Sequence, residues 1–315
     1  MNLKLPERNA YLSRLAPTPL IPIQLEAGDP PVWCKLEFLN PSGSTKDRIA
    51  RHILEKAWRE GGLRPGSVVI EASSGSTSIA MALACAHLGL RFIAVMPEGV
   101  SNERVLTIRA YGGEIRLTPR EGGIRGAIEE TERLAAETGG FLPRQFANVE
   151  NANAHRMGTA REILDQIPGG GVDGVVSGVG TGGTLAGLYA GFRDHGCPAT
   201  PFLARPVNLT GSFEEVECCS FSARIPGVVD CVSTIFDPEA MEGLTTIEVS
   251  DEAAIETTRL LIGKGFPVGP SSGLNFRAAI AAARQMPTGA HVVTVFADRM
   301  ERYFTTELFA PYHCV

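Results

Sequence analysis

A glycine-rich turn follows a short apolar run at Gly174-Val175-Val176-Ser177-Gly178-Val179-Gly180-Thr181-Gly182-Gly183-Thr184-Leu185. Residues 174–177 have the apolar character of a buried strand, and residues 184–193 have the pattern of a helix. A turn between a strand and a helix presents free backbone N–H groups to an anion, and the helix dipole adds positive potential there. The stretch therefore predicts an α/β fold with a phosphate-binding turn, and a tight turn with a purely structural role is the alternative.

The same turn matches the dinucleotide-binding pattern G-x-G-x-x-G through Gly178, Gly180 and Gly183. It is not a Walker A loop, because no Gly-Lys-Ser/Thr follows it. A dinucleotide site also needs an acidic residue at the end of the next strand, about 20 residues further on. The strand expected at 201–204 ends in Arg205, which suits only a 2′-phosphate. An NADP-dependent oxidoreductase is therefore one possible interpretation of this turn.

Strand and helix patterns alternate along much of the chain. The apolar strands among them predict parallel sheets that helices cover on both faces. Two clusters of the alternation are separated by the polar stretch 148–153, so we expect two doubly wound α/β domains. Residues 208–235 lack periodicity and predict a long irregular loop. The expected strands are 67–71, 92–96, 115–117, 174–177, 201–204 and 291–296, and the expected helices are 77–88, 101–111, 122–138, 184–193, 251–263 and 274–285.

Composition indicates an ordinary globular protein. The 315 residues are 44% hydrophobic and 20% charged, and a chain of this length can bury a large core without disulfides or a structural metal. The formal net charge of −6 gives no general electrostatic reason to bind nucleic acid or anionic lipid. No apolar run approaches the roughly 18 residues of a membrane span, and the first residues lack the apolar centre of a signal peptide. Seven cysteines without metal-ligand spacing predict free thiols, so we expect a cytoplasmic protein.

Lysine is scarce in this chain, and one of its five lysines stands at a helix start. The run Asn40-Pro41-Ser42-Gly43-Ser44-Thr45-Lys46-Asp47-Arg48 contains a turn and then a capping Ser44 or Thr45. Lys46 therefore falls in a first helical turn, where the helix dipole disfavours a cation. A solvated lysine is the simplest explanation. A lysine held neutral or as an imine, with its pKa depressed below the usual value, would escape much of this penalty.

A third strand–turn–helix unit carries several hydroxyl groups. Its turn reads Glu71-Ala72-Ser73-Ser74-Gly75-Ser76-Thr77-Ser78. Backbone N–H groups and hydroxyls at a helix start can bind a carboxylate. An ordinary cluster of capping residues is the competing interpretation.

In this order the three segments resemble the cysteine synthase family (O-acetylserine sulfhydrylases), which are pyridoxal-phosphate enzymes of fold type II. The resemblance covers roughly Thr18 to Thr306 and is closest to the B-type cysteine synthases. Other segments that share it are Met96-Pro97-Glu98, Ser101-x-Glu103-Arg104, Arg109-Ala110-Tyr111-Gly112-Gly113, Gln145-Phe146-x-Asn148, Val268-Gly269-Pro270-Ser271-Ser272-Gly273 and Glu301-Arg302-Tyr303-Phe304-Thr305-Thr306.

The resemblance implies a role for each matching residue. Lys46 would hold pyridoxal 5′-phosphate as an imine and later act as the base that moves the α-proton. Ser271 would hydrogen-bond the pyridine nitrogen of the cofactor, and Ser76 stands where the family contacts the 3-oxygen of the cofactor. The phosphate would be held by Gly180, Thr181, Gly182, Gly183 and Thr184, and the substrate α-carboxylate by Ser73, Ser74, Thr77 and Gln145. No catalytic metal is implied.

The resemblance also implies the tryptophan synthase β-like architecture of fold type II, with the cofactor between two domains. Residues 40–148 would form a smaller domain that grips the substrate, and residues 1–39 with 149–315 a larger one that binds the cofactor phosphate. The implied reaction is β-replacement on an O-activated serine such as O-acetylserine, with sulfide or another thiol. A cytoplasmic homodimer is expected. The alternatives are β-elimination from cysteine with release of sulfide, synthesis of another β-substituted alanine, an inactive cofactor-binding regulator, and the NADP-dependent oxidoreductase, which leaves Lys46 unexplained.

The chain departs from the family pattern in three places. Ser76 replaces an asparagine whose amide reaches both cofactor and substrate, and the serine side chain is shorter. Arg205 replaces a glutamate. Residues 208–235 match the family poorly until Gly227. In the family this segment lies where the nucleophile is selected. These departures leave the second substrate open.

Overall fold

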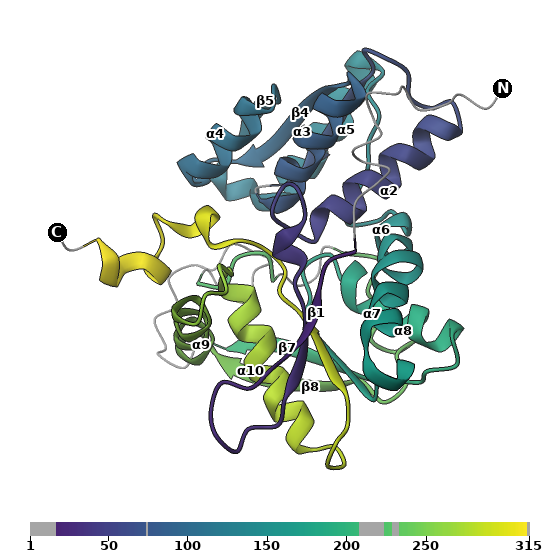
Figure 1. Ribbon diagram of the computed structural model, residues 1–315. Helices are drawn as coiled ribbons and strands as arrows, with labels where there is room; N and C mark the ends of the chain where they lie inside the picture. The colour runs from purple at the N-terminus through teal and green to yellow at the C-terminus, as the bar shows by residue number, and fades with distance from the viewer. Residues whose placement is uncertain (1–16, 74, 208–223, 229–232, 314–315) are drawn as a thin grey trace. The chain divides into compact units, whose positions relative to one another are not determined.

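The computed structural model describes residues 17–73, 75–207, 224–228 and 233–313 (Figure 1). The described chain forms two compact units. One unit comprises Asn40–Asn151, and the other comprises Pro17–Leu39 with the described part of Ala152–Val315. Each unit has its own sheet and its own core, so each is described by itself.

The unit Asn40–Asn151 contains a three-stranded parallel sheet. Its strands are β3 (Val68–Ala72), β4 (Arg91–Pro97) and β5 (Glu114–Thr118), in the order β3-β4-β5. Phe141 extends the free edge of β3 by an isolated parallel bridge to Val69. The carboxyl ends of β3 and β4 lead into the turns that precede the next helices, which is where α/β proteins place ligands.

Helices cover both faces of this sheet. The helices are α2 (Lys46–Arg59), α3 (Ser76–Leu88), α4 (Asn102–Ala110) and α5 (Gly123–Thr138). Val69 packs in one core with α2 and α3, whereas the next residue, Ile70, packs in a second core with α5. Because neighbouring strand residues point to opposite faces, α2 and α3 lie on one face and α5 on the other.

The second unit contains a six-stranded sheet in the order β1-β2-β9-β6-β7-β8. Strand β1 pairs antiparallel with β2, and every other pair is parallel. The strands are β1 (Leu20–Ile23), β2 (Val32–Lys35), β6 (Gly174–Gly178), β7 (Thr200–Val207), β8 (Thr245–Ser250) and β9 (Val292–Val295). Short 3₁₀ helices of this unit lie at Glu37–Leu39, Pro168–Gly170, Met300–Tyr303 and Glu307–Tyr312, and the unit Asn40–Asn151 contains one at Arg120–Gly122.

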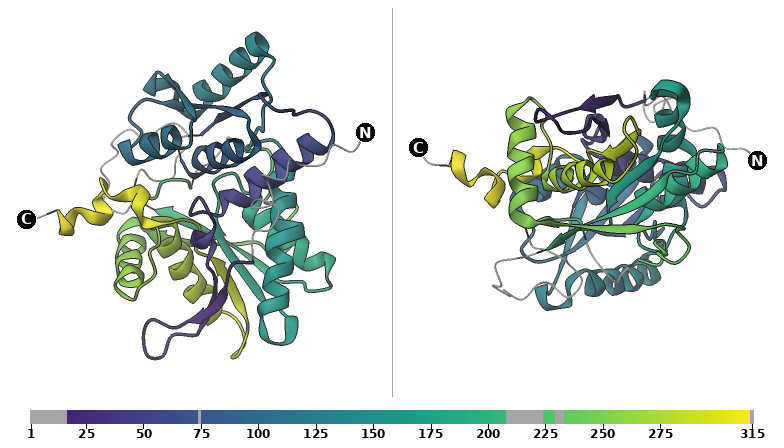
Figure 2. Two further views of the ribbon diagram at one scale, coloured as in Figure 1. Left: turned by 45° about the horizontal axis from the view of Figure 1, so that its top comes forward. Right: turned by 90° about the horizontal axis from the view of Figure 1, so that it is seen from below.

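Two pairs of helices cover the six-stranded sheet (Figures 1 and 2). Val175 packs with α7 (Ala160–Gln166) and α8 (Gly183–Asp194), whereas Val176 packs on the opposite face with α9 (Asp251–Gly263) and α10 (Pro270–Arg284). Helix α6 (Glu150–Ala154) leads into a π-helical segment, His155–Thr159, and then into α7. Both sheets are thus parallel and covered on both faces, apart from the antiparallel edge strand β1, and the predicted α/β fold class is confirmed.

No helix within the described residues combines the length and the apolar character needed to span a bilayer. Only 224–228 and 233–235 of the predicted loop 208–235 lie within the described residues.

Candidate active-site segments

Lys46 is the first residue of α2, as the capping pattern predicts. The backbone N–H of Lys46 donates to Ser44 Oγ at 3.2 Å, so Ser44 satisfies a helix-start amide. The turn before it is fixed by the buried carboxylate of Asp47, which accepts a hydrogen bond from the Ser42 backbone N–H at 3.0 Å and another from the Ser42 hydroxyl. Gly43 has φ +80°, which the turn requires and which L side chains rarely adopt. Lys46 is half-buried on this ordered turn.

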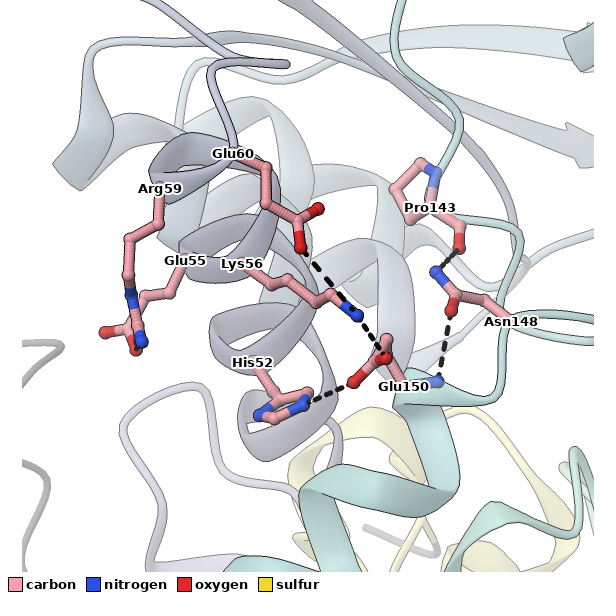
Figure 3. Close-up of polar contacts among 8 residues, drawn as sticks. All are labelled: His52, Glu55, Lys56, Arg59, Glu60, Pro143, Asn148 and Glu150. Carbon is pink, nitrogen blue, oxygen red and sulfur yellow. Dashed lines mark hydrogen bonds and ion pairs between the residues drawn. The ribbon is translucent and has the colours of Figure 1, made fainter. Parts of the chain in front are cut away.

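The other described lysines are placed differently. Lys35 is fully buried, and its Nζ lies 2.8 Å from Glu162 Oε2 and donates to a backbone carbonyl. Lys56 Nζ lies 2.5 Å from Glu150 Oε1, and this hydrogen bond raises the pKa of Lys56 (Figure 3). Lys264 is exposed at the end of α9. Among the described lysines, Lys46 alone begins a helix beside a structured turn.

The hydroxyl-rich turn between β3 and α3 brings together three predicted substrate residues. The Thr77 hydroxyl donates to Gln145 Oε1 at 2.6 Å, and both side chains are buried. Ser73 is held at the end of β3: its backbone N–H donates to the Val95 carbonyl, and its Oγ accepts a hydrogen bond from Gly75 N at 3.2 Å. Thr77 and Gln145 are 68 residues apart in sequence and in direct contact, whereas Ser74 lies outside the described residues.

Ser76 is the first residue of α3 and is half-buried. The helix begins there because Gly75 adopts φ −141° and ψ −139°, outside the helical region. Ser78 Oγ donates to the Ser73 carbonyl at 2.7 Å and ties the helix start back to the strand. Ser76, where the sequence departs from the family pattern, therefore lies at the same helix start as Thr77 and close in sequence to Ser73.

The glycine-rich turn of the second unit connects β6 to α8, as predicted. Gly182 has φ +78°, and a Cβ atom there would collide with Phe236. A Cβ atom at Gly180 would collide with the backbone carbonyl of Gly227. Ser233 Oγ donates to the Thr181 carbonyl at 2.6 Å. The described parts of 224–236 thus pack directly on the turn, so glycine is required there by both conformation and space.

Two residues that the sequence analysis missed orient this turn. His155 is fully buried in the π-helical segment, and its Nε2 lies 3.3 Å from Thr184 Oγ1. Asn275 Oδ1 accepts a hydrogen bond from Gly178 N at 2.7 Å. The close approach of α8 to α6 and to the π-helical segment depends on Gly187, because a Cβ atom there would collide with the Ala152 carbonyl and with His155 Cβ. His155 and Asn275 could be recognised only from the folded structure, where each is a buried polar residue in contact with the glycine-rich turn.

Ser271 is the second residue of α10 and is half-buried. Its neighbour Ser272 accepts a hydrogen bond from Ala297 N at 3.2 Å, which fixes the start of the helix. Ser271 and the turn 180–184 belong to the same unit, whereas Lys46, Ser73, Ser76, Thr77 and Gln145 belong to the other.

Burial is the main cause of the pKa shifts of Glu71 and Cys85 in the unit Asn40–Asn151. Burial raises the pKa of Glu71 to about 8, although hydrogen bonds from backbone amides oppose the shift. Burial also raises the pKa of Cys85, and in the other unit that of Cys34, so neither thiol is set up as a nucleophile. Within the described residues no group of three or more His, Cys, Asp or Glu side chains could hold a metal ion.

The residues present fit pyridoxal phosphate on structural grounds. A phosphate needs several backbone N–H groups at a helix start, and the turn before α8 provides them without side chains at Gly180, Gly182 and Gly183. An aldehyde cofactor needs an amine, and Lys46 provides one on an ordered turn.

Comparisons with known proteins agree with this fit. Residues 12–298 match the family described as pyridoxal-phosphate dependent enzymes. The cysteine synthase of Staphylococcus aureus (strain Mu50 / ATCC 700699) is 38% identical over 285 residues, 89% of each chain. Among solved structures, O-ureido-L-serine synthase superimposes with a TM-score of 0.83 at 33% identity, covering 96% of this chain and 95% of the other. The hydrogen sulfide-producing enzyme Fn1055 of Fusobacterium nucleatum gives a TM-score of 0.86 at 31% identity, covering 96% and 91%. The chain therefore belongs to the pyridoxal-phosphate dependent enzymes of fold type II and is a homologue of the cysteine synthases within them.

Proposed function

We propose that this enzyme catalyses β-replacement on an O-activated serine such as O-acetylserine, with sulfide or another thiol as the incoming nucleophile. The observation that carries the proposal is the contact between Thr77 and Gln145 beside Ser73 at the end of β3. This cluster of hydroxyl and amide groups suits the carboxylate of a small amino acid. The names of the relatives, a cysteine synthase and an O-ureido-L-serine synthase, support the same reaction class.

Each unit would have a separate task. Residues 40–148 would grip the amino acid through Ser73, Ser74, Thr77 and Gln145. The unit that contains the turn 180–184 would bind the cofactor phosphate, with Ser271 at the pyridine nitrogen. His155 would keep the Thr184 hydroxyl in place through their contact.

Lys46 would anchor the cofactor and then accept the proton from Cα of the bound amino acid. Bound pyridoxal phosphate supplies an electron sink for the bonds at Cα. The Cβ–O bond of the substrate breaks, and acetate leaves with its electron pair. A sulfur–carbon bond then forms at Cβ, and Lys46 returns the proton to Cα. This sequence conserves atoms and electrons without an external oxidant or reductant.

A second candidate is β-elimination, in which cysteine or the O-activated serine loses its β-substituent and no nucleophile is added. Ser76 favours this candidate, because a serine provides less reach and one donor fewer than an asparagine amide at the start of α3. The structural likeness to a hydrogen sulfide-producing enzyme also supports it.

We also propose a cytoplasmic homodimer, as the resemblance implies. Cys34, Cys85 and Cys197 are free thiols in the described residues, which suits a reducing compartment.

The purified protein tests the proposed function directly. A visible cofactor band should shift on addition of O-acetylserine, and acetate should then be released. With sulfide present the main product should be cysteine. If pyruvate and ammonia accumulate instead, β-elimination is the principal reaction. A protein that shows no shift with O-acetylserine or cysteine would contradict both candidates.

A further inference from the structure

Glu71 is a buried carboxyl group that is not among the predicted cofactor or substrate residues. It is only 3% exposed and lies on β3, one residue before the strand ends. Its Oε1 accepts a hydrogen bond from the Ala72 backbone N–H at 2.9 Å, and its Oε2 accepts one from the Gln145 backbone N–H at 3.1 Å. The backbone amide of Arg144 also opposes the rise that burial causes in the pKa of this carboxyl group. One side chain therefore connects the end of β3 to a segment 74 residues further along the chain.

The segment needs this support because it leaves the sheet at that point. Phe141 still pairs with β3: its N–H donates to the Val68 carbonyl at 2.8 Å, and its carbonyl accepts from Ile70 N at 2.9 Å. Two residues later Pro143 has no N–H, so the ladder cannot continue. Arg144 then has φ +55° and is the only described residue other than glycine with a positive φ. Such a conformation costs roughly 1 to 2 kcal/mol and persists only when surrounding contacts hold it.

The far side of the same turn is held by polar contacts of its own (Figure 3). Asn148 Nδ2 donates to the Pro143 carbonyl at 2.9 Å, and Asn148 Oδ1 accepts from Glu150 N at 3.0 Å. The Glu150 carboxylate contacts His52 Nε2 at 2.8 Å and Lys56 Nζ, both on α2. The backbone carbonyl groups of the turn have partners in the same region: Arg144 O accepts from Asn148 N at 2.8 Å, and Gln145 O accepts from Asn151 Nδ2 at 2.7 Å. The backbone N–H of Gln145 is instead held by the Glu71 carboxyl group.

The orientation of the Gln145 side chain follows from this backbone placement. Its Nε2 donates to the Ala72 carbonyl at 2.7 Å, and its Oε1 accepts from the Thr77 hydroxyl at 2.6 Å. Both partners belong to the end of β3 and the start of α3. A displacement of residues 144 and 145 would break these two bonds and leave the Thr77 hydroxyl without its acceptor.

We propose that Glu71 is a positioning residue for the amino-acid substrate: its carboxyl group holds the backbone N–H of Gln145, next to the left-handed residue Arg144, and thereby holds the Gln145 side chain against Thr77. This inference rests on the proposed function, because it assigns Gln145 and Thr77 to substrate binding. The printed hydrogen bonds of Glu71 go to backbone amides, so we assign it no part in the chemical step.

The variant Glu71→Gln tests the hydrogen bonds of the Glu71 carboxyl group, because glutamine has nearly the same size and shape as glutamate. Both carboxyl oxygens accept backbone hydrogen bonds, and a protonated carboxyl still retains acceptor capacity on each oxygen. An amide cannot do this, because its nitrogen only donates and would face a backbone N–H group. The variant loses one backbone bond in either protonation state of the wild-type carboxyl. Glu55→Gln is the matched control, since Glu55 is a mostly buried carboxylate of the same unit whose partners are Arg51 and Arg59 on its own helix.

The first measurement is amide hydrogen exchange of the holoenzyme. In Glu71→Gln, exchange should accelerate in peptides that cover residues 142–147, whereas Glu55→Gln should leave these peptides unchanged. Equal protection of residues 142–147 in wild type and Glu71→Gln would overturn the inference, whatever reaction the enzyme catalyses. If Glu71→Gln does not fold, Glu71→Asp retains the charge with a shorter reach, and the same comparison applies to it.

The second measurement separates positioning from general stability. The dissociation constant of the amino acid, taken from the spectral shift, should rise roughly tenfold or more in Glu71→Gln and in Gln145→Ala, the order expected for one lost hydrogen bond to a charged group. The double variant should bind no more weakly than Gln145→Ala alone, because Glu71 acts through Gln145. Additive losses would overturn the inference while the proposed function stands. A wild-type protein that binds no amino acid would overturn both.

Discussion

Raising the pH from 6 to 7.5 should destabilise this protein through the carboxyl group of Glu71. Burial raises its pKa from 4.5 to about 8 in the folded chain. Between these two values the folded state keeps the proton and the unfolded state releases it. The contribution of Glu71 to the free energy of unfolding is therefore fully present below about pH 4.5, and it is lost as the pH rises toward and through about 8. In that window each pH unit lowers the free energy of unfolding by about 1.4 kcal/mol, so 1.5 units lower it by about 2 kcal/mol.

The assay compares wild type with Glu71→Gln, which has no proton to release at this position. Equilibrium urea denaturation of both proteins at pH 6 and pH 7.5, at one ionic strength, gives four free energies of unfolding. The difference between wild type and variant should fall by about 2 kcal/mol from the lower to the higher pH, because all other titrating groups cancel. A difference that stays constant or grows with pH would refute the reasoning. It would mean that the backbone amides of Ala72, Arg144 and Gln145 outweigh burial and keep the carboxyl ionised.

Two further substitutions test the predicted cofactor and substrate segments. Gly182→Ala should weaken cofactor retention by roughly tenfold or more, because the added Cβ atom collides with Phe236; equilibrium titration with pyridoxal phosphate measures this. Gly196→Ala is the control, because Gly196 has φ +73° and an added Cβ atom would meet nothing within 4 Å. This variant should lower the free energy of unfolding by about 1 kcal/mol and leave the affinity for pyridoxal phosphate unchanged. Equal affinities for the two variants would contradict the prediction. Ser76→Asn should shift the products from pyruvate toward cysteine when O-acetylserine and sulfide are both supplied, and an unchanged ratio would show that Ser76 does not control the outcome.

The sequence predicts the parts of the fold in which the physical signal is local. The strand–turn–helix at 174–185 has an apolar run, a glycine turn and a helix pattern within twelve residues, and the structure contains all three. The start of α2 at Lys46 is signalled equally locally by its capping residues. Strand β8 is not predicted, because it is an edge strand whose half-exposed residues lack a long apolar run. The helices in residues 150–166 are not predicted either, because three short helical segments follow one another there and no regular periodicity results.

The supporting residues of the site could not be predicted in this way. Glu71 and Gln145 are 74 residues apart, and His155 and Thr184 are 29 apart. Neither pair forms a sequence motif. Gln145 reaches Glu71 because the chain returns to the edge of β3, and His155 reaches Thr184 because the π-helical segment packs on α8. The functional side chains lie in short motifs, whereas the groups that hold them are recognised by burial and hydrogen bonding in the folded chain.

The lysine to which the cofactor is attached can be identified chemically. Reduction of the holoenzyme with borohydride fixes pyridoxal phosphate to its lysine, and peptide mapping by mass spectrometry then locates the modified residue. We expect the pyridoxyl group on Lys46, the amine at the start of α2. Modification of Lys35, Lys56 or Lys264 in place of Lys46 would contradict it.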